Sequence, residues 1–356
     1  MKIILSGGGT LGPVTPLLAI YEALTREYKD ATFIWIGTKG GPEKEIVEKA
    51  GIPFIAITSG KLRRYISFWN VIDIFRIVIG FFRSIGIMFR YSPDACISAG
   101  GYVSVPLHWA AWLFGVPSWI HQQDVQVGLS NRFMAPFARI ITTSLESQMK
   151  LFPKRKVKWI GNPVRNEILS GSKDRAMELF DLKEDLPIIF ATGGGTGSLR
   201  VNQMIVEAVG HLKGHAQIIH LTGKERPQEL AEKAQKHFDY YQVHQFFSEE
   251  MKHAYAAADI VISRGGFGTL SELAALSKPA ILIPKHGHQV QNVSFLAEAG
   301  AVEVVDETTK DGNYLARLVK DLISDKNRMI TLGSTLNKTM PLATETKIVG
   351  ILKSIL

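Results

Sequence analysis

The chain has 356 residues, of which 46% are hydrophobic, and this is enough apolar material for two cores of ordinary size. The formal net charge of +8 is uneven: residues 1–164 hold 19 Lys and Arg against 10 Asp and Glu, whereas residues 165–356 hold 22 against 23. Cys96 is the single cysteine, which excludes an intrachain disulfide and fits a reducing cytoplasm.

The first half alternates short apolar runs with helical patterns. Strands are expected at residues 2–5, 32–36, 54–57, 95–98, 118–121 and 140–143. This alternation predicts a parallel sheet with right-handed crossovers. Cys96 lies inside one of the apolar runs, so we expect its side chain to be buried.

A glycine-rich run, Gly-Gly-Gly-Thr-Leu-Gly at residues 7–12, follows the first expected strand and precedes a helical pattern. The backbone N–H groups of such a turn can bind an anion at a helix start. A similar run, Gly-Gly-Gly-Thr-Gly, stands at residues 193–197. Neither run has the Lys-Ser/Thr of a P-loop, so the alternative is that both are only tight strand-to-helix turns.

Residues 61–90 combine basic and bulky apolar side chains. Arg76, Arg83 and Arg90 recur every seven residues and so lie on one side of a helix among aromatic residues, as in a helix that rides on an anionic bilayer surface. Charged residues interrupt the apolar stretch, so no spanning helix is predicted. The alternative is a core helix whose arginines form its solvated face. Both interpretations hold if part of this region is buried and only residues 62–69 touch lipid.

The second half repeats the strand–helix alternation, with strands expected at residues 188–192, 217–221, 241–245, 260–263, 280–283 and 301–304. An Asn-Pro pair within residues 159–165 marks the linker. We expect domains at residues 1–163 and 164–341, with a final helix, residues 342–356, packing back on the first. Two doubly wound domains bind ligands at the carboxyl ends of their strands, which predicts a cleft between them.

The most specific motif is Ile-Ser-Arg-Gly-Gly-Phe-Gly-Thr-Leu-Ser-Glu-Leu at residues 262–273. Residues 265–269 are expected to form an anion-binding loop at a helix start, and Glu272 can accept hydrogen bonds from both hydroxyls of a ribose. Downstream, Gln289 and Asn292 share a helical face and suit sugar hydroxyls. The alternative is that Ser271 and Glu272 are ordinary helix-start residues.

With these motifs the chain resembles the MurG family of N-acetylglucosamine transferases over nearly its whole length. The resemblance runs in order through residues 8–10, 60–64, 93–94, 100–104, 121–123, 128–131, 161–165, 220–223, 251–259 and 263–272. It implies the two-domain glycosyltransferase-B fold and an inverting transfer of N-acetylglucosamine from UDP-N-acetylglucosamine to undecaprenyl-pyrophosphoryl-N-acetylmuramoyl-pentapeptide, without metal or cofactor. It also implies a peripheral location on the anionic cytoplasmic face of the plasma membrane, with proteins of cell-wall synthesis or division as further partners.

Carried over by position, the resemblance places substrate contacts at Thr10, Leu11, Gly12, Asp124, Arg165, Gly195, Ser248, Phe267, Gly268, Thr269, Leu270, Ser271, Glu272 and Gln289. On the acceptor side it places Gly100, Gly101, Tyr102, Ser104 and Asn131.

Three positions depart from the family pattern. Pro13 stands where the family has a histidine proposed for the acceptor site or catalysis, and a proline cannot move a proton. Gln122 replaces the family's glutamate, while Asp124 adds a carboxylate two residues later. Gly195 replaces a serine, whose hydroxyl Thr196 or Ser198 could supply.

An inverting transfer needs a base close to the attacking hydroxyl, and Asp124 is our candidate. The alternative is that Asp124 only hydrogen-bonds the ligand or a nearby loop. His121 is expected to be a structural residue at a strand end, and His288 either contacts the sugar or begins a helix.

Three other functions stay open. The chain could use a different lipid-linked acceptor, since the changes fall on the acceptor side. It could be a UDP-N-acetylglucosamine 2-epimerase, although that activity leaves the basic segment at residues 61–90 unexplained. It could also bind the nucleotide-sugar without catalysis. Nucleic-acid binding is not expected, because no recognised nucleic-acid module is present.

Overall fold

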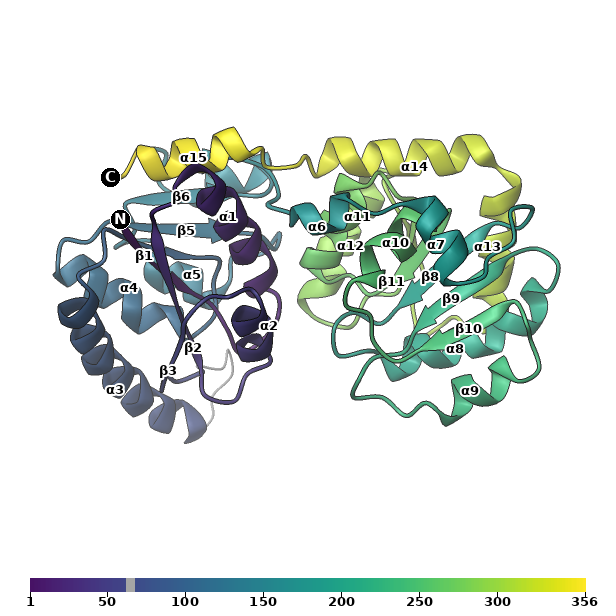
Figure 1. Ribbon diagram of the computed structural model, residues 1–356, viewed down its shortest axis with the longest axis horizontal. Helices are drawn as coiled ribbons and strands as arrows, with labels where there is room; N and C mark the ends of the chain where they lie inside the picture. Colours follow the sequence, from purple (N-terminus) through teal and green to yellow (C-terminus); the bar gives the residue numbers. More distant parts are fainter. Residues whose placement is uncertain (62–67) are drawn as a thin grey trace. The chain divides into compact units, whose positions relative to one another are not determined.

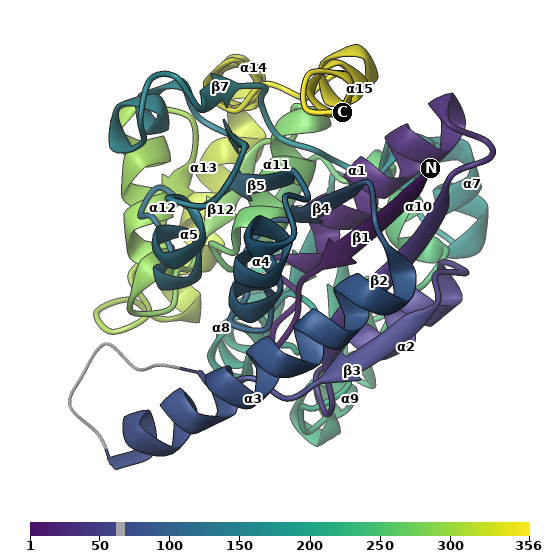
Figure 2. The ribbon, with the colours of Figure 1, turned by 90° about the vertical axis from the view of Figure 1, so that its left-hand side faces the viewer.

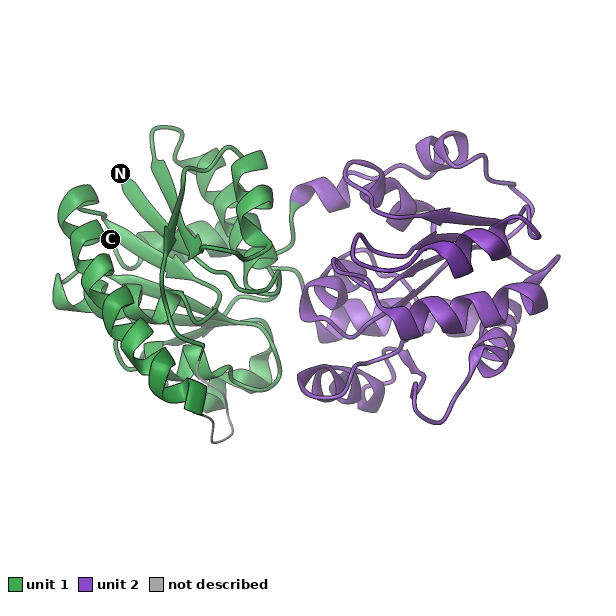
Figure 3. Ribbon diagram, turned by 90° about the horizontal axis from the view of Figure 1, so that it is seen from below, with its two compact units in different colours: residues 1–165, 342–356 green, residues 166–341 purple. Residues whose placement is uncertain are grey.

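The computed structural model describes residues 1–61 and 68–356 (Figure 1). The chain divides into two compact units, coloured separately in Figure 3. Unit 1 contains Met1–Arg165 and Leu342–Leu356, and unit 2 contains Asn166–Pro341.

Unit 1 is built on a seven-stranded parallel sheet with the order β3-β2-β1-β4-β5-β6-β7. Its strands are β1 (Lys2–Ser6), β2 (Thr32–Thr38), β3 (Phe54–Ile57), β4 (Ala95–Ser98), β5 (Ser118–Gln122), β6 (Ile140–Thr143) and β7 (Val157–Trp159). Strand β7 was not among the expected strands, because three residues with a lysine in the middle give too short an apolar signal.

Helices cover both faces of this sheet, as β1 illustrates. Ile3 and Leu5 point into one core, whereas Ile4 points into the other with Cys96, whose predicted burial is confirmed. The helical segments of unit 1 are α1 (Val14–Glu27), α2 (Glu43–Lys49), α3 (Phe68–Tyr91), α4 (Ser104–Leu113), α5 (Leu129–Met134), the 3₁₀ helix η1 (Glu146–Leu151) and α15 (Glu345–Lys353).

Unit 2 contains a six-stranded parallel sheet with the order β10-β9-β8-β11-β12-β13. Its strands are β8 (Ile188–Thr192), β9 (Gln217–Leu221), β10 (Tyr241–His244), β11 (Ile260–Ser263), β12 (Ala280–Leu282) and β13 (Glu303–Val304). The helices are α6 (Asn166–Leu169), α7 (Lys173–Leu179), α8 (Leu199–Val209), η2 (Gly210–Leu212), α9 (Glu229–Gln235), α10 (Glu250–Ala257), α11 (Phe267–Ala275), α12 (His288–Glu298), α13 (Gly312–Ser324) and α14 (Lys326–Thr339). The prediction of two doubly wound α/β domains is confirmed.

The last helix, α15, belongs to the core of unit 1. Its apolar face, including Ile348 and Leu352, lies in the same buried cluster as α1. The side chain of Thr344 caps its first turn by accepting a hydrogen bond from the N–H of Lys347 (3.3 Å). Residues from both ends of unit 1 therefore share one core.

Candidate active site

The carboxyl ends of β1 and β4 bring the first glycine-rich loop against residues 100–102. Gly101 has a φ of +94°, and a Cβ added there would lie 2.9 Å from the carbonyl oxygen of Gly8. A Cβ on Gly9 would overlap the ring of Tyr102. Only glycines allow this close approach, so the two motifs form one surface.

Three other residues of the acceptor-side prediction gather at the same loops. Pro13 caps α1 where the family has histidine, and its ring lies 4.0 Å from a Cβ built on Gly100. The Ser104 hydroxyl is buried within hydrogen-bond distance of the carbonyl oxygens of Ser6 (2.9 Å) and Gly100 (3.0 Å). Asn131 is also buried, and its amide donates to Gln122 Oε1 (2.7 Å). Ser104 and Asn131 thus support the loops from beneath instead of facing solvent.

Asp124 follows β5 on a loop that buried glutamines hold. The side-chain amides of Gln122 and Gln148 each donate to its carbonyl oxygen, both at 2.7 Å. The Asp124 residue itself is half-buried. His121, in β5, is fully buried between Thr142 and Ser144, and burial lowers its pKa to about 3. His121 is therefore a structural residue.

A carboxylate that the motifs did not indicate lies beneath the first glycine loop. Glu43, the first residue of α2, is 0% exposed. Its Oε2 accepts from the Gly9 N–H (3.2 Å), and its Oε1 accepts from the N–H (2.6 Å) and the hydroxyl (2.5 Å) of Thr38. An acidic residue in a first helical turn is common, so the position of Glu43 in the sequence did not indicate a role in the site.

In unit 2 the predicted anion loop is shorter than expected. Helix α11 begins at Phe267 after the extended Gly266, so residues 267–269 form its first turn and Glu272 lies in the second. Leu270 is a core side chain, and the Ser271 hydroxyl donates to the Phe267 carbonyl oxygen (2.9 Å). The side chains of these two residues therefore turn into the protein, because the helix begins earlier in the motif than expected.

The Glu272 carboxylate is 8% exposed and lies against the core. The hydroxyl of the fully buried Tyr255 donates to its Oε2 (3.2 Å). Tyr255 packs edge-on against Phe190, with ring centroids 5.2 Å apart. The rigid tyrosine therefore fixes the direction of the carboxylate.

Arg264 ties together the carboxyl ends of the unit 2 strands. Its Nε donates to the Ser198 hydroxyl (2.9 Å), and its Nη1 donates to the Ile283 carbonyl oxygen (2.8 Å). The same Nη1 lies 2.7 Å from Glu307 Oε2, and both side chains are mostly buried. The Ser198 hydroxyl also caps α8, so it is not available to replace the family serine.

The second glycine-rich loop has a cation beside it. The Arg226 Nε donates to the Gly197 carbonyl oxygen (3.3 Å), and a Cβ on Gly223 would overlap Gly197. Gly195 and Thr196, at the tip of this loop, are exposed. Gly195 and Thr196 can therefore contact a ligand at the surface of unit 2.

The remaining predicted contacts are spread over both units. Ser248 is exposed, and its N–H donates to Glu250 Oε2 (2.9 Å). Gln289 Oε1 accepts from the Lys285 N–H (3.0 Å) at the start of α12, where His288 is exposed. In unit 1, Thr10 and Gly12 are exposed, whereas Leu11 and Arg165 are partly buried.

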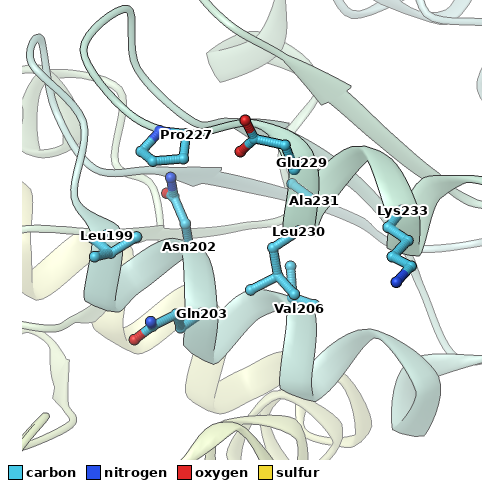
Figure 4. Close-up of a pocket in the computed structure, with 9 residues that line it drawn as sticks. All are labelled: Leu199, Asn202, Gln203, Val206, Pro227, Glu229, Leu230, Ala231 and Lys233. Atoms are coloured by element: carbon cyan, nitrogen blue, oxygen red, sulfur yellow. The ribbon is translucent and has the colours of Figure 1, made fainter.

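A hollow of about 340 Å³ lies between α8 and α9 (Figure 4). It contains none of the predicted site residues; its lining consists of Leu199, Asn202, Gln203, Val206, Pro227, Glu229, Leu230, Ala231 and Lys233. The chemistry indicated by the motifs therefore lies elsewhere on unit 2.

Helix α3 runs along the outside of unit 1 beside α4 (Figure 2). Only a narrow stripe of it is buried, and Arg76, Arg83 and Arg90 are exposed together with large apolar side chains. Those exposed by half or more are Phe68, Trp69, Val71, Ile74, Phe75, Phe82 and Phe89, with Trp112 and Leu113 on α4. The core-helix alternative holds in part, because Ile87 and Met88 near the end of α3 belong to a core cluster.

Residues 62–67, where lipid contact and part of the 60–64 motif were expected, lie outside the described part of the chain. Among the described residues, none of the helices has the length and hydropathy needed to cross a membrane.

Comparison with known proteins identifies relatives over the whole chain. The glycosyltransferase family 28 N-terminal domain matches residues 3–143, and the C-terminal domain of that family matches residues 188–346. A UDP-N-acetylglucosamine–N-acetylmuramyl-(pentapeptide) pyrophosphoryl-undecaprenol N-acetylglucosamine transferase of Shouchella clausii is 35% identical over 92% of this chain and 93% of its own. A transferase of the same name from Legionella pneumophila is 33% identical, covering 99% of this chain and 96% of its own.

Solved structures share the fold. The MurG crystal structure from Acinetobacter baumannii superposes with a TM-score of 0.76 at 23% identity, covering 99% of each chain. A UDP-GlcNAc 2-epimerase from Neisseria meningitidis superposes with a TM-score of 0.72 at 13% identity, covering 99% of this chain and all of its own. These two likenesses show the architecture alone.

Proposed function

The chain belongs to the MurG family of glycosyltransferases, and we propose that it transfers N-acetylglucosamine from UDP-N-acetylglucosamine to undecaprenyl-pyrophosphoryl-N-acetylmuramoyl-pentapeptide, converting lipid I to lipid II for peptidoglycan. The observation that carries this proposal is the identity of 33–35% to transferases of that name over 92–99% of the chain. The geometry of unit 2 supports the donor half of the reaction.

The donor would bind at the first turn of α11. The N–H groups of Phe267, Gly268 and Thr269 start this helix and have no carbonyl partner within it, so they are free to meet a diphosphate. Glu272, fixed by Tyr255, would accept hydrogen bonds from the ribose hydroxyls. Fixed dipoles at this turn would stabilise the negative charge that builds on UDP as it leaves.

In the reaction an acceptor hydroxyl attacks the anomeric carbon, the bond to the diphosphate breaks, and UDP leaves with the electron pair. The hydroxyl proton must pass to a base. We assign this role to Asp124, because it is a half-buried carboxylate on a loop that Gln122 and Gln148 hold in place.

An assay with radiolabelled UDP-N-acetylglucosamine and a lipid I analogue tests the reaction. We expect a labelled disaccharide-lipid product. Conversion of the nucleotide-sugar without acceptor would indicate an epimerase, labelling of only other prenyl-pyrophosphoryl sugars would indicate another acceptor, and binding without transfer would indicate a silent binding protein.

The Asp124→Asn variant tests the base. We expect the rate of transfer to fall about 100-fold or more, with the affinity for UDP-N-acetylglucosamine retained. The exposed Asp30→Asn is the matched control in unit 1. Activity of Asp124→Asn near that of the unmodified protein eliminates Asp124 as the base and leaves it a hydrogen-bonding residue.

We further propose that α3 and the adjoining end of α4 bind the anionic cytoplasmic face of the plasma membrane. Phe75 and Phe82 are each 66% exposed, and Arg76 and Arg83 lie beside them on the same helix. Aromatic side chains can enter the lipid interface while the arginines meet anionic headgroups. Phe75→Ser with Phe82→Ser should weaken binding to vesicles that contain phosphatidylglycerol at least tenfold, whereas Ile330→Ser, an exposed apolar residue in unit 2, should not.

A further inference from the structure

Glu43 is a carboxylate enclosed completely by the protein. A Cβ atom at Gly8 or Gly41 would overlap the Glu43 carboxylate, so the glycines at these two positions leave room for its side chain. Its two oxygens accept three hydrogen bonds, from the Gly9 N–H and from both polar groups of Thr38. The side chain is 0% exposed and has no surface from which it could touch a substrate.

The loop above Glu43 is held from two sides. Beneath it, the carboxylate binds the Gly9 N–H, and above it the Tyr102 ring lies where a Cβ of Gly9 would be. The loop entrance is fixed as well, because the Trp35 indole N–H donates to the Gly7 carbonyl oxygen (2.9 Å). A shift of Glu43 would therefore move the part of the loop that contacts Tyr102.

Thr38 is a neighbour of both the Glu43 carboxylate and Tyr102. Its hydroxyl donates to Glu43 Oε1. The Ser59 hydroxyl secures Tyr102 from the opposite direction by donating to its carbonyl oxygen (3.1 Å).

We propose that Glu43 is a positioning residue for the acceptor, which sets the first glycine loop and the Tyr102 side chain in the arrangement that receives the lipid-linked sugar. The inference rests on the proposed transfer reaction. Glu43 acts through the loop and not on the reacting atoms, since its oxygens are already occupied and buried.

The test compares Glu43→Gln with Glu45→Gln, an exposed glutamate on the same helix that pairs with the surface residue Lys49 at 2.9 Å. A glutamine keeps the shape of Glu43 but turns an N–H donor toward the Gly9 or Thr38 N–H. We expect the KM for a lipid I analogue to rise about tenfold or more in Glu43→Gln, and the dissociation constant of UDP-N-acetylglucosamine to change less than twofold. A merely structural role would lower kcat through the fraction of active protein and leave both constants unchanged.

A second pair of variants examines the hydroxyl of Thr38, which donates to Glu43 and lies beside Tyr102. Thr38→Val removes the hydroxyl and should raise the acceptor KM, whereas Thr38→Ser keeps the hydroxyl and should restore it. Equal effects of these two variants, or an unchanged acceptor KM in Glu43→Gln, would overturn the proposal.

Hydrogen exchange separates this inference from the reaction on which it rests. In Glu43→Gln, but not in Glu45→Gln, the backbone amides of residues 7–13 should exchange faster. If the unmodified protein transfers nothing to lipid I, the proposed function fails, and the exchange data still decide whether Glu43 holds the loop. Unchanged exchange in Glu43→Gln overturns the inference in either case.

Discussion

The two glycine-rich loops have the same position in their units and opposite charges beside them. Each follows the first strand of its sheet and precedes a helix. The loop of unit 1 gives the Gly9 N–H to the buried Glu43 carboxylate, whereas the loop of unit 2 receives a hydrogen bond from Arg226 at Gly197. Arg264 binds Ser198 at the end of that second loop.

This difference indicates which loop suits a diphosphate. A carboxylate beneath a loop repels a phosphate and also uses one of the N–H groups that would bind it. Arg226 does the reverse, because its guanidinium group attracts phosphate oxygens. We therefore expect UDP at unit 2 and uncharged polar groups of the acceptor at the Gly9 end of the first loop.

The largest expected effect comes from breaking the ion pair behind the second loop. Arg264→Met leaves Glu307 without its partner in a mostly buried position, so unit 2 should lose about 3–5 kcal/mol of unfolding free energy. Far-UV circular dichroism in denaturant measures this loss. All six tryptophans lie in residues 1–165, so tryptophan fluorescence follows unit 1 separately and should barely shift. Adding Glu307→Gln should recover part of the loss; no recovery would contradict the explanation.

The next effect is the destabilisation of unit 1 by acid through its buried histidines. Both histidines of unit 1, His108 and His121, are fully buried, and burial lowers each pKa to about 3 from 6.5. Between these values the unfolded chain binds protons that the folded unit does not, so the stabilisation is complete above pH 6.5 and falls with the pH below it. Each histidine contributes a slope of up to about 1.4 kcal/mol per pH unit.

His108→Leu should therefore reduce the pH dependence of the tryptophan-detected transition by about half between pH 6.5 and 5. Neither ring nitrogen of His108 has a hydrogen-bond partner among the described residues, so this change should also stabilise unit 1. An unaltered slope would show that His108 does not cause the acid sensitivity.

A smaller effect is expected for donor binding. Arg226→Gln removes the cation beside the second loop and should weaken UDP binding about fivefold to tenfold, as measured by calorimetry. Arg175→Gln, which affects only an exposed pair with Glu178, is the control and should change nothing. Equal affinities for Arg226→Gln and the unmodified protein would remove the electrostatic distinction between the loops.

The smallest effect concerns a surface contact of unit 1. Arg26 and Glu345 form an ion pair at 3.2 Å, with side chains 47% and 45% exposed. Arg26→Ala should cost less than about 1 kcal/mol, because solvent screens exposed pairs. A much larger shift of the fluorescence transition would mean that α15 depends on this pair more than on its apolar face.

Much of the fold was predictable because buried parallel strands are short apolar runs. Strands β3, β4, β6, β8, β9 and β11 have the expected limits. The expected strand at residues 301–304 shrinks to Glu303–Val304, because Ala301 and Val302 pack in the core without pairing to β12. Strand β7 was not predicted, because a periodic side-chain pattern cannot be recognised over only three residues.

The candidate site was predictable where ligand contacts use the backbone of a motif, as in residues 267–269. It was less predictable for side chains, since a motif does not reveal which way each one points: Leu270 and Ser104 are both buried. Glu43 and Arg264 depend on distant partners, Gly9 and Glu307, which no local pattern connects. Their roles become visible only when the loops at the strand ends are seen together.

The placement of α15 has a consequence for biosynthesis. Unit 2 is one continuous stretch, whereas unit 1 needs Leu342–Leu356 to complete the apolar cluster around α1. During translation, residues 166–341 are made before that segment, so unit 2 has its full sequence while unit 1 still exposes part of its interior. We expect the nascent N-terminal half to depend on chaperones until the final helix leaves the ribosome.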